Sequence, residues 1–211
     1  MLAARHLVGD VTVAYLVLHP GCAQPSKRWP PRHWQELIHA LQGDGWGIVL
    51  TGSGGDAEAC AAIASGAVRC LAGKTPWDVL TAIVSGAAAV VACDTGIVHL
   101  AQAVGTPSLA LFGPTDPSVW GHAEPGHRSL TQRLECSHCN LGRCPKVKAD
   151  AISPCLAAIA PEAVRRELRA LLAARPSSPA PGGHGLPVLP VAAAAAGGPG
   201  DRAAAWSAAR R

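Results

Sequence analysis

The chain has 211 residues, of which 49% are hydrophobic and 15% charged, so it can bury a core, and wholesale disorder is excluded. Residues 1–174 hold 14 basic and 13 acidic side chains, a net charge of +1, which excludes the basic surface expected of a protein that binds nucleic acid. No run approaches the roughly 18–20 uncharged apolar residues of a membrane span, so no transmembrane segment is expected.

The composition changes near residue 175. Residues 175–211 contain 6 Pro, 6 Gly and 11 Ala without helical or strand periodicity, which predicts a disordered tail after a folded domain at residues 1–174. The first residues lack the long apolar segment of a secretory signal, and the eight cysteines then favour a reducing compartment over a disulfide scaffold. We therefore expect a cytoplasmic protein.

Apolar runs typical of buried strands alternate with segments of helical periodicity. In chain order we predict a strand over 11–19, a helix over 31–43, a strand over 46–51, an alanine-rich helix that ends near residue 65, a strand over 68–72, a helix over 76–85, a strand over 88–93, a helix over 97–104, a strand over 107–112 and a helix over 161–174. Because short joints connect most of them, we expect an α/β fold, a Rossmann-like doubly wound parallel sheet with helices on both faces.

Five polar or glycine-rich loops follow the predicted strands, at residues 21–29, 52–56, 73–75, 94–96 and 113–116. Ligands of parallel α/β sheets bind at the carboxyl ends of the strands. The five loops therefore predict one binding site along a single edge of the sheet.

The loop Asp94-Thr95-Gly96 lies between a strand and a helix, where free backbone amides and the helix dipole favour an anion. Gly96 would let a phosphate approach the backbone, and His99, one turn after Thr95, could face the same ligand. The alternative is that Asp94 or Thr95 caps the helix and that His99 is an interior histidine. An aspartic protease is set aside, because its Asp-Thr-Gly occurs twice in an all-β fold.

Two further loops offer polar side chains. Ser26 and Lys27 could present a hydroxyl and a cation to a phosphate; the alternative is a solvated lysine beside a buried tryptophan. Asp56 or Glu58, after the second predicted strand, could bind ribose hydroxyls, although acids in a first helical turn commonly just complement the helix dipole.

Four cysteines fall close together in a cysteine-rich segment at residues 128–155. Cys136, Cys139, Cys144 and Cys155 have the spacing of thiolates that bind zinc or iron in a tetrahedron, with His138 as a substitute ligand. The segment has little apolar periodicity of its own, which favours a structural metal. The alternatives are unligated thiols or a redox pair.

Taken together, these segments resemble glycosyltransferase family 9, the ADP-heptose:lipopolysaccharide heptosyltransferases. The most specific similarity is Asp94-Thr-Gly-Ile-Val-His99 followed by Phe112-Gly-Pro-Thr-Asp-Pro117, and the resemblance covers about residues 16–172. In that family two Rossmann-like halves face each other across a cleft, the GT-B arrangement. This chain resembles only the C-terminal half, which binds the nucleotide-sugar.

The resemblance implies transfer of a heptose from ADP-heptose, or of a related sugar, to a lipopolysaccharide core or another glycan, without a metal in catalysis. It also implies an enzyme that is cytoplasmic or peripheral at the inner face of the cytoplasmic membrane. Some relatives that modify proteins carry an iron knuckle of four cysteines. The donor-binding residues that the resemblance implies are Lys27 with Ser26 on the phosphates, Asp94, Thr95 and Gly96 on the diphosphate and sugar, His99 beside them, and Asp56 or Glu58 on the ribose.

The general base of the family lies on its N-terminal half, which this sequence is expected not to contain. The chain could then be a piece of a full enzyme, or could work with a separate acceptor-binding polypeptide or by self-association. A different class of function is a nucleotide-sugar-binding module without catalysis, or a truncated remnant. A zinc-knuckle interaction protein is a further alternative that rests on the cysteines alone.

Overall fold

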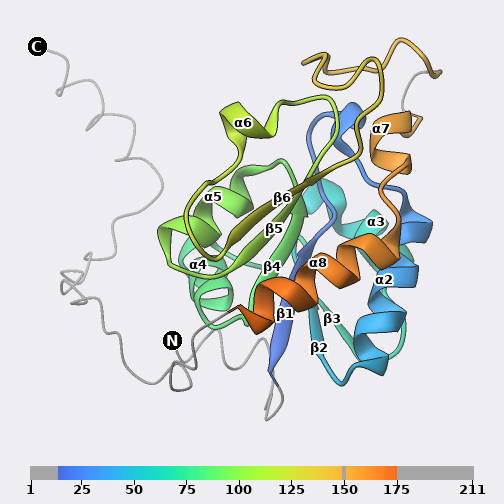
Figure 1. The fold of residues 1–211 in the computed structure, drawn as a ribbon. Coiled ribbons are helices and arrows are strands. Elements are labelled where there is room, and N and C mark those ends of the chain that lie inside the picture. Colours follow the sequence, from blue (N-terminus) through green and yellow to red (C-terminus); the bar gives the residue numbers. More distant parts are fainter. Residues whose placement is uncertain (1–13, 149–150, 175–211) are drawn as a thin grey trace, which may run out of the picture. The chain divides into compact units, whose positions relative to one another are not determined.

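The structure is a computed structural model that describes residues 14–148 and 151–174, all within one compact unit of the chain (Figure 1). The predicted tail at residues 175–211 and the first residues of the strand predicted over 11–19 lie outside the described residues.

Six parallel strands form one sheet in the order β3-β2-β1-β4-β5-β6. Their bounds are Tyr15–His19 (β1), Gly47–Leu50 (β2), Val68–Cys70 (β3), Ala89–Cys93 (β4), Ser108–Phe112 (β5) and His127–Thr131 (β6). This is the strand order of the Rossmann fold, so the predicted doubly wound sheet is confirmed. The order reverses between β1 and β4, where ligands of such sheets bind.

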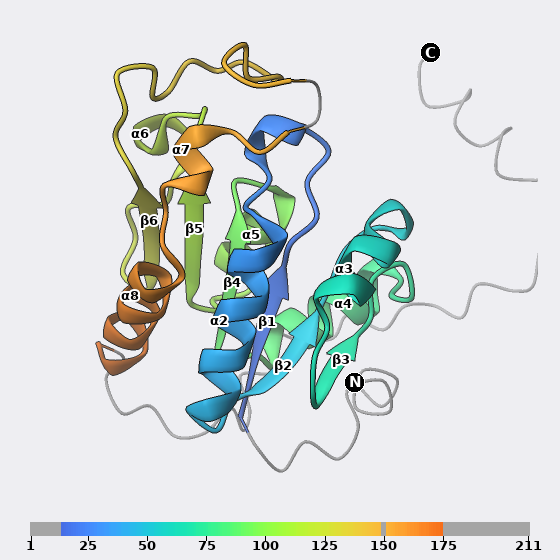
Figure 2. The ribbon, with the colours of Figure 1, turned by 90° about the vertical axis from the view of Figure 1, so that its right-hand side faces the viewer.

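Helices cover both faces of the sheet, as Figures 1 and 2 show. One face packs against α2 (Pro31–Gly43), α3 (Ala57–Ile63) and α8 (Pro161–Ala173), and the other packs against α4 (Trp77–Ser85) and α5 (Gly96–Ala103). Side chains alternate between the two cores along each strand: Leu16 and Leu18 join the first core and Val17 joins the second. Because both faces are covered, β4 and β5 consist of buried residues alone.

Long-range contacts fix the loop that follows β1. The Trp29 indole N–H donates to the carbonyl of Ile159 (2.9 Å), and its ring packs edge-on against Trp34 on α2. Farther along α2, the Asp44 carboxylate accepts hydrogen bonds of 2.6–2.9 Å from Arg165 and Arg169 on α8. Hydrogen bonds from Arg165 lower the pKa of Asp44 to about 2. The β1–α2 unit is thereby held against the end of the described chain.

The described residues form five elements that the sequence did not predict: the short 3-10 helices η1 (Pro25–Lys27) and η2 (Gly54–Asp56), the helices α6 (Pro117–Trp120) and α7 (Pro154–Ala157), and the edge strand β6. The residues of β6 are only half-buried or exposed, so its sequence shows no apolar run. Asp116 is the N-cap of the short helix α6, and its carboxylate accepts a hydrogen bond from the Ser118 backbone N–H. No helix within residues 14–148 and 151–174 is long and apolar enough to cross a membrane.

Candidate functional site

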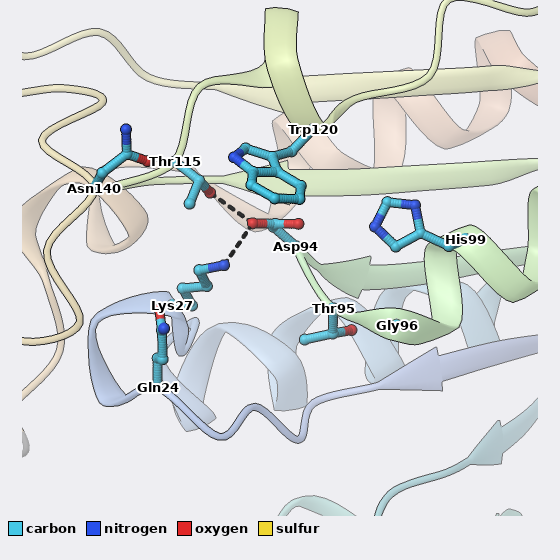
Figure 3. Close-up of a pocket in the computed structure, with 9 residues that line it drawn as sticks. All are labelled: Gln24, Lys27, Asp94, Thr95, Gly96, His99, Thr115, Trp120 and Asn140. Carbon is cyan, nitrogen blue, oxygen red and sulfur yellow. Dashed lines mark hydrogen bonds and ion pairs between the residues drawn. The ribbon is translucent and has the colours of Figure 1, made fainter. Parts of the chain in front are cut away.

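A cavity of about 540 Å³ opens at the carboxyl ends of β1, β4 and β5 (Figure 3). Three loops that follow these strands contribute to it, together with α6 and the segment after β6. The cavity therefore lies where the strand order reverses, which is the expected ligand position in this fold. Its lining residues are Gln24, Lys27, Asp94, Thr95, Gly96, His99, Thr115, Trp120 and Asn140.

A buried carboxylate lies at the centre of the cavity. Asp94 is only 6% exposed, and its Oδ2 accepts hydrogen bonds from Lys27 Nζ and from Thr115 Oγ1, both at 2.7 Å (Figure 3). A carboxylate this deeply buried needs a cation and hydrogen bonds to compensate for lost hydration. The contacts join the loops after β1, β4 and β5 into one charged network.

The N-terminus of α5 faces the cavity without a side-chain cap. The Thr95 hydroxyl donates instead to the carbonyl of Cys93 (3.2 Å), and the Asp94 carboxylate is held by Lys27 and Thr115. Thr95 occupies the N-cap position, as one alternative has it, but neither its hydroxyl nor the Asp94 carboxylate accepts a hydrogen bond from the amides of the first turn. A Cβ placed on Gly96 would meet no atom within 4 Å. This end of α5 thus offers backbone amides and open space to an anion.

His99 is exposed in the cavity, so the alternative of an interior histidine is wrong. Its ring meets that of His122 edge-on with centroids 4.8 Å apart, and His122 in turn contacts His127 at 5.6 Å. His127 Nδ1 lies 2.8 Å from the Ser108 hydroxyl. Burial, and then the charge of the neighbouring His99, lower the pKa of His122, with Glu124 opposing. Three imidazoles thus run from the cavity to the edge of the sheet.

Five of the residues expected to bind the donor line the cavity together: Lys27, Asp94, Thr95, Gly96 and His99. Ser26 does not. It is 1% exposed, and its hydroxyl donates to the carbonyl of Leu141 (2.8 Å) rather than facing the cavity. Its contact therefore joins the loop after β1 to the segment that follows β6.

The two acids considered for the ribose lie outside the cavity wall. The Asp56 carboxylate accepts hydrogen bonds from the backbone N–H (2.8 Å) and the hydroxyl (2.5 Å) of Ser53, in its own loop. It packs directly on Gly21, since a Cβ there would overlap the carboxyl group. Glu58 is exposed on α3. Asp56 thus lies at the carboxyl ends of β1 and β2, outside the residues that line the cavity.

Sequence reasoning did not single out four of the lining residues: Gln24, Thr115, Trp120 and Asn140. Two of them lie in loops already expected at the ligand edge, at 21–29 and 113–116, so position after a strand was a usable signal for Gln24 and Thr115. Trp120 is 51% exposed on α6, a helix that the sequence did not predict. No local pattern marks Asn140, because its place depends on how the cysteine-rich segment folds back.

The cysteine-rich segment carries free thiols. Within the described part of the chain, no group of three or more His, Cys, Asp or Glu side chains is close enough to hold a metal ion, these four cysteines included. Cys155 is buried, and burial, with smaller contributions from Cys144 and Cys136, raises the pKa of its thiol. A metal at these four cysteines therefore stays a prediction.

The sequence matches the model of glycosyltransferase family 9 (heptosyltransferase) over residues 3–150. Lipopolysaccharide heptosyltransferase 1 of Pseudomonas aeruginosa is 33% identical over 132 residues, covering 62% of this chain and 37% of that protein. The structure of Escherichia coli ADP-heptose lps heptosyltransferase II superposes with a TM-score of 0.70 at 27% identity, over 82% of this chain and 50% of that one. E. coli heptosyltransferase WaaC with ADP gives a TM-score of 0.61 at 25% identity, over 80% and 48%.

The chain therefore spans 37% of the length of the Pseudomonas relative and about half of the two solved chains. The match to the family model covers well over half of the sequence and includes Lys27, the Asp94 loop and Thr115. Those residues are the ones that the structure brings together around the cavity. The chain belongs to glycosyltransferase family 9, the heptosyltransferase family.

Proposed function

We propose that this chain binds ADP-heptose, or a closely related nucleotide-sugar, as the donor half of a heptosyltransferase of lipopolysaccharide synthesis. The observation that carries the proposal is the placement of the Lys27 ammonium and the uncapped N-terminus of α5 in one cavity. A cation and free helix amides together suit a diphosphate. The E. coli relative solved with ADP supports the choice of nucleotide.

In the transfer, the bond between the sugar's anomeric carbon and the diphosphate oxygen breaks, and a bond to an acceptor hydroxyl oxygen forms. The departing ADP keeps the electron pair, and the acceptor proton passes to a general base. Lys27 and the α5 amides stabilise the charge that develops on the diphosphate. Asp94 holds Lys27 through Oδ2, and its other oxygen points toward the His99 side of the cavity, where it can accept from a sugar hydroxyl (Figure 3).

The ribose would then extend toward the ends of β1 and β2. Asp56 packs on Gly21 there, and Glu58 follows two residues later, so both stay candidates for a ribose contact. Ser26 acts on the phosphates indirectly in this proposal, by holding the backbone at Leu141.

The acceptor site and the general base are assigned to a second Rossmann-like half, carried either by the same polypeptide or by a separate one. The chain spans 37–50% of the relatives described above, which leaves room in those proteins for such a half. We place the reaction in the cytoplasm, where the eight free cysteines would stay reduced.

Calorimetric titration with ADP, with UDP as the competing nucleotide, tests the proposal. The chain should bind ADP and bind UDP at least about tenfold more weakly, and Gly96→Ala should weaken ADP binding by about tenfold or more because its methyl group occupies the diphosphate position. The stability of this variant should not fall, since the methyl meets open space and alanine favours helix.

Gly43→Ala is the matched control. Gly43 is exposed at the end of α2, its added Cβ would also meet no atom within 4 Å, and it lies outside the cavity. Its ADP affinity should equal that of the wild type. A wild-type chain that binds neither nucleotide, or a Gly96→Ala chain that binds ADP as well as the Gly43→Ala control, would contradict the proposed site.

A further inference from the structure

The segment between β6 and α7, residues 132–153, brings a side chain into the cavity that no sequence motif marked. Asn140 lies in this segment, between Cys139 and Cys144, and lines the cavity beside Thr115 (Figure 3). Gln24 and Lys27 lie on the same side of the cavity as Asn140, whereas Gly96 and His99 lie on the other side.

The backbone holds Asn140 in a specific conformation. Its φ is +56°, in the left-handed region that asparagine and glycine tolerate and most other residues avoid. Its N–H donates to the carbonyl of Pro114 (2.8 Å), the residue before Thr115. Asn140 is therefore attached directly to the loop whose threonine binds Asp94.

A second contact fixes the other side of Asn140. The carbonyl of the next residue, Leu141, accepts the hydrogen bond from the buried Ser26 hydroxyl. Ser26 precedes Lys27, so the peptide around Asn140 is held between the lysine loop and the threonine loop. These are the two loops that supply the hydrogen bonds to Asp94.

We propose that Asn140 is a donor-binding residue whose carboxamide N–H donates to a phosphate oxygen of the nucleotide-sugar. This inference rests on the proposed function. A carboxamide carries two donors and no charge, and it stands on the side of the cavity where Lys27 supplies the cation. Ser26 is the positioning residue: it sets the place of Asn140 through Leu141 and does not line the cavity.

Two substitutions of Asn140 distinguish the contribution of its side chain to binding from that of its backbone conformation. Asn140→Gly removes the carboxamide and keeps the left-handed φ, and it should weaken ADP binding by about fivefold to tenfold, the usual effect of losing one hydrogen bond to a charged group. Asn140→Asp keeps the shape but places a negative charge against the diphosphate, and it should weaken binding by about thirtyfold or more. Inorganic diphosphate should show the same order of affinities.

Gln132→Glu is the matched control for the aspartate, because it adds one negative charge to an exposed position in the same segment, outside the cavity. It should bind ADP as the wild type does. Wild-type binding that persists within twofold in both Asn140 variants would overturn the role of Asn140 while leaving the proposed function intact. Failure of the wild type to bind ADP would overturn both.

A double-mutant cycle tests the positioning role of Ser26. Ser26→Ala removes the hydroxyl that holds Leu141 and should weaken ADP binding by about threefold to fivefold in the wild-type background. In the Asn140→Gly background it should have little further effect, because there is no carboxamide left to position. Additive losses would show that Ser26 acts independently of Asn140 and would overturn the positioning role.

Discussion

Two parts of the cavity lining are built in different ways. One, which we call the strand wall, consists of Lys27, Asp94–Gly96 and Thr115 at the ends of β1, β4 and β5. The residues of β4 and β5 are all buried, so the sheet itself positions this wall. The other, which we call the segment wall, is Asn140 in residues 132–148. Side chains in this segment are half-buried or exposed, and two hydrogen bonds to neighbouring loops hold the backbone around Asn140.

The difference indicates which property each wall controls. The strand wall cannot move without disturbing the core, and its carboxylate is buried, so changes to the hydrogen-bonded network of Lys27, Asp94 and Thr115 should alter stability and affinity together. The segment wall has few buried apolar contacts, so it can open at little cost to the rest of the fold. Changes there should alter ligand affinity and leave global stability almost unchanged.

The largest effect on stability and ADP affinity is expected for Lys27→Met, which removes the cation of the strand wall. The change leaves the Asp94 carboxylate buried without its cation, and such a loss lowers the free energy of unfolding by about 3–5 kcal/mol. ADP affinity should also fall by at least about tenfold, since the cation that we propose for the diphosphate is gone. Denaturant unfolding and calorimetric titration measure the two effects.

Arg32→Met, at the exposed start of α2, removes the same charge outside the cavity and serves as the control. It should change neither stability nor ADP affinity appreciably. If Lys27→Met lowered affinity but not stability, the ion pair with Asp94 would not be part of the folded core, and the distinction between the walls would fail.

The next effect is a pH dependence of stability from His19, at the end of β1. Burial lowers the pKa of His19 from 6.5 to about 4, with Asp56 opposing. The unfolded chain therefore binds a proton on this side chain near pH 6.5, whereas the folded protein does so only near pH 4. As the pH falls through this range, the free energy of unfolding should fall by up to roughly 3.5 kcal/mol, at 1.4 kcal/mol per pKa unit.

Thermal unfolding between pH 7 and pH 4 measures this slope. His19→Gln should flatten it, and His39→Gln, at an exposed position on α2, should leave it as in the wild type. An unchanged slope in His19→Gln would show that other groups cause the loss of stability in acid.

The smallest effect on stability is expected in the segment wall. If the four cysteines bind zinc or iron, the native protein should contain about one metal ion per chain, and Cys136→Ser should lose it. ADP affinity should then fall by about threefold to tenfold, because Asn140 lies between two of the cysteines, while the melting temperature of the domain changes by less than about 2 °C. Cys70→Ser, on β3, is the control that removes a thiol elsewhere. Native protein without zinc or iron would exclude the metal.

The same contrast explains what could be predicted from the sequence. The apolar run that forms β4 and the Asp94-Thr95-Gly96 loop after it are local patterns, so this part of the strand wall could be predicted, along with Lys27 and His99. Thr115 was expected only as a member of the loop at 113–116. The edge strand β6 has no apolar run. The place of Asn140 depends on two hydrogen bonds to residues far away in the chain: its own N–H donates to Pro114, and the carbonyl of Leu141 accepts from Ser26. Local periodicity carries no information on such contacts. Ser26 illustrates this: its residue type suggested a phosphate ligand, whereas its hydroxyl binds a carbonyl.

The contacts of Trp29 and Asp44 bear on how the chain folds as it is made. Their partners, Ile159 and Arg165, follow them by 130 and 121 residues. At a synthesis rate of about 5–20 residues per second, the apolar face of α2 waits on the order of ten seconds for α8 to cover it. During that interval the apolar face of α2, which packs beside β1, stays exposed to solvent. The nascent chain is then most exposed to aggregation. Protection of this early β1–α2 unit should therefore raise the yield of folded protein in the cell.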